Sequence, residues 1–184
     1  MDLIRLQNYY ALFYYGIALH FSYLFLNDLT TDAVVPMIAS ICYFGGDMIT
    51  QMMIDHQMGK KNLMTYAHHV IAISLLSQLR NDPGDLEIFG LLLLTEISSV
   101  FLALKFFIKS KSLQKINNIL FALSFIYTRA IYCNFRLFKI APSYFSVIGP
   151  IKALIMGTSL LGVVALNMTW TYLIVRKLVK MYIN

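Results

Sequence analysis

The segment LMTYAHHVIAISLLSQL, residues 63–79, places two adjacent histidines, His68 and His69, inside a run that is otherwise almost entirely apolar. Its length is at the short end for a helix that crosses a membrane. Two imidazoles in an apolar segment need polar partners or a function. Their interpretation therefore depends on the structure that the rest of the chain forms.

The composition indicates an integral membrane protein. Of the 184 residues, 59% are hydrophobic and 13% are charged, and the mean hydropathy is +0.67. A soluble domain holds about 25% charged residues, so this chain has too few charges to face water on all sides. We therefore expect one polytopic transmembrane domain over residues 1–184.

Apolar runs of about 17–25 residues are long enough to cross the hydrocarbon core of a bilayer. Six such runs are present, at residues 9–26, 34–54, 63–79, 88–108, 116–138 and 151–175. Backbone polar groups in lipid must be satisfied within the segment, and no run alternates with the period of a barrel strand. The sequence predicts an all-α bundle of about six transmembrane helices.

Basic residues gather on one side of this six-span topology. The side with both termini has nine: Arg5, Lys60, Lys61, Lys109, Lys111, Lys115, Arg176, Lys177 and Lys180. The other side has three, Arg80, Arg136 and Lys139, with the acids Asp28, Asp32, Asp82, Asp85 and Glu87. The positive-inside rule places both termini in the cytoplasm, or in the matrix of a mitochondrion. The formal charge of +6 thus reflects topology, and no basic soluble face indicates a nucleic-acid partner.

Cysteine and proline positions give two smaller expectations. Cys42 and Cys133 lie within expected spans, so we interpret them as small buried packing residues and not as a disulfide. Pro142 and Pro150 are expected to stop helices and to leave a short re-entrant or interfacial piece between them.

The ionisable residues Asp47, His68, His69, Glu96 and Arg129 fall within the expected spans, where each costs a few kcal/mol unless it is paired or functional. At about 1.5 Å per residue, Asp47, His68 and His69 lie at a similar level, roughly 8–10 Å from the basic face. Glu96 and Arg129 lie deeper, near mid-membrane. The sequence therefore predicts two sets matched in depth, a carboxylate with imidazoles and a carboxylate with a guanidinium.

Each set has a structural and a chemical interpretation. A carboxylate on one imidazole nitrogen leaves the other as a general base or nucleophile, but the same bond can simply orient two helices. Glu96 and Arg129 can likewise form a buried ion pair. Adjacent histidines diverge by about 100°, and no spaced ligand motif is present, so we expect no metal.

The order of these residues resembles the TLC domain, the family of TRAM, Lag and CLN proteins that includes ceramide synthases. The segments that carry the resemblance, from about residue 34 to 180, are CYFGGDMI, YAHHVIAISLL, LLLLTEISSVFLALKFF, FALSFIYTRAIY and ALNMTWTYLIVRKL. The resemblance implies a helical barrel whose interior takes an acyl chain or another lipid. It also implies that Asp47, His68 and His69 line that interior.

One departure from the ceramide synthase branch bears on activity. That branch uses a later His-Asp pair and a further Asp to transfer an acyl group from acyl-CoA to a long-chain base. Here Thr95 and Glu96 stand in place of the His-Asp pair, and Ser99 stands in place of the further Asp. Half of the acid–base apparatus is absent, and the chain resembles the minimal TLC form.

Two functions therefore remain. The first is a non-catalytic protein that binds a phospholipid or sphingolipid with no other cofactor, as an accessory subunit of a larger membrane complex in the mitochondrial inner membrane or the endoplasmic reticulum. Its intramembrane polar residues would be Asp47, His68, His69, Glu96, Ser99 and Arg129. The alternative is a lipid-modifying acyltransferase in which His68 or His69 reacts and Asp47 orients it.

Overall fold

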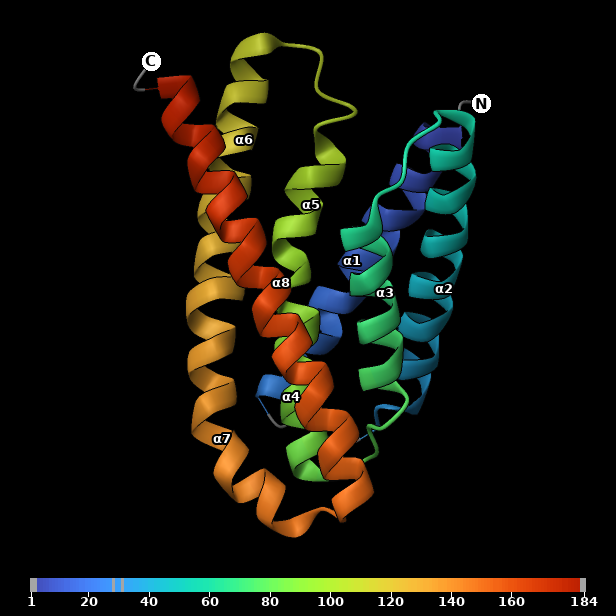
Figure 1. Ribbon diagram of the computed structural model, residues 1–184, viewed down its shortest axis with the longest axis vertical. Coiled ribbons are helices and arrows are strands. Elements are labelled where there is room, and N and C mark those ends of the chain that lie inside the picture. The colour runs from blue at the N-terminus through green and yellow to red at the C-terminus, as the bar shows by residue number, and fades with distance from the viewer. Residues whose placement is uncertain (1–2, 28, 31, 183–184) are drawn as a thin grey trace.

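The computed structural model describes residues 3–27, 29–30 and 32–182, and these form helices joined by short loops (Figure 1). Asp28, counted above among the acidic residues, lies outside them. The helices are α1 (Leu3–Leu26), α2 (Val34–Gln57), α3 (Leu63–Leu76), α4 (Pro83–Leu94), α5 (Glu96–Leu104), α6 (Lys111–Phe125), the π-helix η1 (Ile126–Cys133), α7 (Asn134–Val147) and α8 (Pro150–Tyr182). The prediction of an all-α membrane bundle is confirmed.

Two of the six expected spans each consist of more than one helix. Helices α4 and α5 form one rod with a one-residue break at Thr95, and α6, η1 and α7 form another. Within the described residues, four segments are long and apolar enough to cross a membrane: the two rods just named, helix α2 and helix α8. Helix α1 is also 24 residues long, whereas α3 has only 14.

The rods close into a ring. Helix α1 packs on α2, α2 on α3, α3 on α8, α8 on η1 and α6, α6 on α5, and α5 back on α1. In the upper half of Figure 1, α1–α3 lie on the right and α5, α6 and α8 on the left, and the two chain ends lie at this same end of the bundle. The ring gives the ionisable side chains Asp47, His69, Glu96 and Arg129 a protein-lined interior to face, as lipid requires.

The end of the bundle opposite the termini is packed solid. Phe89, Ile88, Leu91 and Met156 are fully buried there. Asp85, also fully buried, accepts hydrogen bonds from the Arg80 backbone N–H, the Tyr144 hydroxyl and, at 2.6 Å, the Lys152 ammonium. This cluster ties α4, α7 and α8 together.

Two expectations about local structure need correction. Helix α3 ends at Leu76 and not at Leu79, because Gln78 and Leu79 donate their N–H groups to the carbonyls three residues before them and tighten the last turn. Pro142 does not stop a helix and lies inside α7, on its exposed face, while Tyr144 anchors the following turn to Asp85. Pro150 does mark a boundary, as the first residue of α8.

The two cysteines also differ from each other. Cys133 is buried, as expected for a packing residue, but Cys42 is exposed on the outer face of α2. Both are free thiols. The expectation of burial was wrong for Cys42 because apolar composition alone does not distinguish the lipid face of a span from its inner face.

Candidate functional site

The ring encloses a cavity of about 420 Å³. Its polar lining comes from six rods and includes every candidate from the sequence: Asp47, His68, His69, Glu96, Ser99 and Arg129. Ser98, Thr65, Lys177 and the hydroxyl-bearing Tyr15 and Tyr43 line it too, among aromatic and aliphatic side chains such as Phe121, Phe125, Trp170 and Ile174. The two depth-matched sets therefore face one cavity.

The structure brings Asp47 to His69 and not to His68. The Nε2 atom of His69 lies 2.9 Å from one carboxylate oxygen of Asp47, and the Gln7 amide donates to the other at 2.7 Å. His69 is buried, and its Nδ1 atom has no hydrogen-bond partner in the described part of the chain. With Nε2–H directed at Asp47, Nδ1 carries the free lone pair of the neutral imidazole.

His68 faces a different set of neighbours, as the angle between adjacent helical positions requires. Its ring packs edge-on against Phe44 of α2 at 5.9 Å and Trp170 of α8 at 5.3 Å, between ring centroids. The two imidazoles are themselves 5.5 Å apart. His68 thus closes the inner part of the cavity between α2 and α8, and His69 joins α3 to α2.

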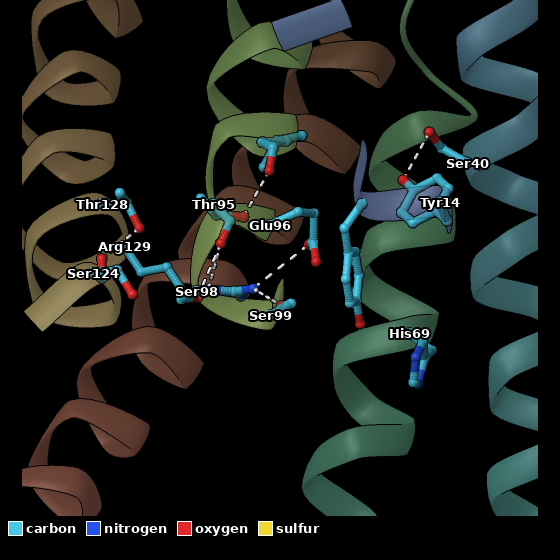
Figure 2. A network of polar contacts seen from close by, with 12 residues as sticks. Tyr14, Ser40, His69, Thr95, Glu96, Ser98, Ser99, Ser124, Thr128 and Arg129 are labelled. Atoms are coloured by element: carbon cyan, nitrogen blue, oxygen red, sulfur yellow. Dashed lines mark hydrogen bonds and ion pairs between the residues drawn. The ribbon is translucent and has the colours of Figure 1, made fainter. Parts of the chain in front are cut away.

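Arg129 organises the opposite wall, as Figure 2 shows. Its Nε atom donates to the Thr95 carbonyl at 3.2 Å and to the Ser98 hydroxyl at 3.1 Å, and a terminal nitrogen donates to the Ser99 hydroxyl at 3.0 Å. The same terminal nitrogen lies 3.5 Å from a carboxylate oxygen of Glu96. Arg129 and Glu96 are both buried, so the pair neutralises two charges within the spans.

Both rods that meet at this pair have irregular backbones at its level. The Thr95 hydroxyl donates to the Leu92 carbonyl at 2.6 Å, and such a bond competes with the regular helical ladder, which is interrupted between α4 and α5. Arg129 lies within the π-helix η1, and π segments frequently occur at functional sites. The break opens the Thr95 carbonyl to Arg129, and it puts Glu96 in the first turn of α5, where the helix dipole favours a carboxylate.

Several residues in or near the cavity could not be singled out from the sequence. Tyr43 donates to the Tyr15 hydroxyl at 3.0 Å, but these are two of 12 tyrosines in an aromatic-rich chain and no spacing distinguishes them. Gln7 precedes the first expected span, so only its contact with Asp47 reveals its position.

Asp55 is a further polar residue that the sequence did not single out. It is buried and accepts hydrogen bonds from Gln51, Tyr66 and the Asn62 N–H. It fixes the α2–α3 turn and lies outside the cavity lining.

The arrangement can hold a ligand and can supply a base. Asp47, His69, Glu96 and Arg129 offer donors and acceptors with little net charge, in a space whose remaining walls are largely apolar. Within the described residues, no three His, Cys, Asp or Glu side chains lie close enough together to hold a metal ion.

A polar cavity inside a ring of apolar helices is the arrangement of an integral membrane protein whose interior carries polar groups. The family model of the TLC domain matches residues 6–176, and the chain belongs to that family. Membership makes it a membrane protein associated with lipid. No curated protein and no solved structure matches the chain.

The network predicts a large effect of Arg129→Met on stability. The substitution leaves Glu96 as a buried charge without compensation, and we expect the free energy of unfolding in detergent micelles to fall by about 3–5 kcal/mol. Adding Glu96→Gln to the same chain should recover part of this loss, because the unpaired charge is removed.

The matched control is Arg136→Met. Arg136 pairs with Glu87, but both side chains are about one-third exposed, and such pairs contribute at most about 1 kcal/mol. Equal losses from the two arginine substitutions, measured by chemical unfolding, would contradict the central role assigned to Arg129.

Proposed function

We propose that the protein binds a membrane lipid, a phospholipid or sphingolipid, in the 420 Å³ cavity without transforming it. The observation that carries the proposal is that both buried polar sets face this cavity together with an apolar wall. Ionisable groups within a membrane almost always face a bundle interior and mark a ligand or ion pathway. A lipid's polar group would meet Asp47, His69 and the Glu96–Arg129 pair, and its chain would lie along Leu102, Phe121 and Ile174.

The contacts of Thr95, Glu96 and Ser99, which stand where the ceramide synthase branch has its later acid–base residues, support a non-catalytic role. The Thr95 hydroxyl is bonded to a backbone carbonyl, and Ser99 and Glu96 are both engaged by Arg129. These three positions therefore contribute to a fixed network, in which none is free to move a proton to or from a substrate.

A substitution that fills the cavity should remove the lipid. Thr65 lines the cavity, and its hydroxyl makes no hydrogen bond within the described residues, so Thr65→Trp adds bulk without breaking a contact. We expect the variant purified in mild detergent to carry several-fold less lipid than the wild type, measured by native mass spectrometry and by lipid extraction. Val70→Trp, on the exposed face of the same helix, is the control and should carry as much lipid as the wild type.

Two results would contradict lipid binding. One is wild-type protein that carries no lipid after mild extraction. The other is full lipid occupancy in Thr65→Trp.

We further propose that the chain is an accessory subunit of a larger membrane complex, in the mitochondrial inner membrane or the endoplasmic reticulum, with its basic end in the matrix or the cytoplasm. Support comes from the outer face of α2, which is exposed at Ile49, Met52 and Met53. These side chains line a shallow groove with His56 and Gln57. Methionine is an adaptable packing residue that suits a contact with another protein.

The native mass tests this role. After mild extraction from its own membrane, the chain should migrate in a particle many times heavier than its own 21.1 kDa, with fixed partners identified by mass spectrometry. Met52→Lys with Met53→Lys should release it, because two charges are introduced on the proposed contact face. A particle of the mass of one or two chains would exclude a subunit role.

One specific observation favours a second candidate, a lipid-modifying enzyme of the acyltransferase type. The pair of His69 Nε2 with Asp47, and the unpaired Nδ1 atom, is the arrangement by which a carboxylate orients an imidazole for general-base or nucleophilic work. In this function His69 would accept a proton or an acyl group at Nδ1, and Asp47 would stabilise the charge that develops on the ring.

The histidine variants separate the two candidates. For an enzyme, His69→Ala and Asp47→Asn should each change the cellular lipid profile while protein abundance is kept, and His68→Ala should have a smaller effect. For the binding protein, the same variants lower abundance or lipid occupancy and leave the lipid profile unchanged. Quantitative lipid analysis normalised to protein level makes the comparison.

A further inference from the structure

A second, smaller cavity of about 40 Å³ lies beside the main one. Phe44, His68, Glu96 and Arg129 line both cavities and form the partition between them. Tyr14, Thr95 and Asn167 of α8 also line the smaller cavity, and the rest of its lining is aliphatic. Its volume suits one water-sized polar group and excludes a lipid chain.

Asn167 is the side chain in this cavity that lacks a partner. It is 2% exposed, and its Nδ2 atom has no hydrogen-bond acceptor in the described part of the chain. Three of the neighbouring side chains have partners: the Tyr14 hydroxyl donates to Ser40, the Thr95 hydroxyl to the Leu92 carbonyl, and Arg129 to Thr95, Ser98 and Ser99. Buried amide donors in folded proteins nearly always have a partner, so an acceptor is missing at this point.

The electrostatics of the lining decide what that acceptor is. Glu96 and Arg129 offset each other's charge, and Asn167 carries a neutral amide, so an anion would gain no countercharge to balance its burial. An uncharged oxygen would accept from Asn167 Nδ2. A hydroxyl suits the site best, because it would also donate a hydrogen bond to the carboxylate of Glu96.

We infer that this smaller cavity binds a hydroxyl-type oxygen, held by Asn167 Nδ2 as donor and by Glu96 as acceptor. The oxygen belongs either to a hydroxyl of the lipid in the main cavity, inserted past Phe44 and His68, or to an ordered water molecule. The first source rests on the proposed lipid-binding function and narrows its ligand to a hydroxyl-bearing lipid; the second does not depend on it.

The test uses the full chain, freed of native lipid in detergent, with 1-hexadecanol as the probe and hexadecane as the apolar control of equal length. For a lipid hydroxyl, 1-hexadecanol raises the thermal unfolding temperature of the wild type in a dose-dependent way and hexadecane does not. Asn167→Leu, which keeps the volume and removes the donor, then weakens the apparent affinity for 1-hexadecanol about fivefold to tenfold. Asn134→Leu, the same change at a buried asparagine outside both cavity linings, leaves the affinity unchanged.

An ordered water gives a different pattern. The response to 1-hexadecanol is then independent of Asn167, and a high-resolution map of the probe-free wild type shows an oxygen about 3 Å from Nδ2. The inference is overturned if Asn167→Leu leaves the response unchanged and no such oxygen is present. Failure of the lipid-binding function is seen separately, as wild-type protein that neither retains lipid on mild extraction nor responds to either probe.

Discussion

The fixed charge of Arg129 is the constraint on which the interior depends. A guanidinium keeps its proton in any protein environment, so a span that carries it must give it acceptors within the bundle. The acceptors come from one place, the start of α5, where Thr95, Ser98 and Ser99 supply oxygen atoms and Glu96 supplies the opposite charge. The break before α5 and the π-helix around Arg129 allow two long rods to meet at this point.

The polar contacts of Arg129 lie around the cavity. The opposite end of the bundle is filled by a close-packed cluster of aliphatic and aromatic side chains, which includes Phe89 and Leu91. The bundle therefore has two parts. One end is a close-packed core that holds the rods together, and the other is a space whose walls carry the polar groups.

The sequence was sufficient for the class of fold and for the main polar groups of the cavity. Apolar run lengths and charge placement yield six rods, and depth counting matches Asp47 to the histidines because helical rise is uniform. It could not decide which imidazole meets Asp47, because that depends on the rotation of α3 about its axis. Nor could it find Gln7, Tyr15 or Asn167, since their roles arise from contacts between rods that are distant in sequence. The ends of α3 and the passage of α7 through Pro142 depend on local hydrogen bonds that composition does not show.

The shortness of α3 has a consequence for the surrounding bilayer. Its 14 residues cover about 21 Å, against roughly 30 Å of hydrocarbon, and Figure 1 shows the α2–α3 loop descending before α3 begins. Its outward side chains, Leu63 and Val70, are exposed, so lipid packs directly against a helix that is too short for it. Such a hydrophobic mismatch thins the adjacent leaflet. The headgroup plane beside α3 is thereby drawn down toward the depth of His68 and His69.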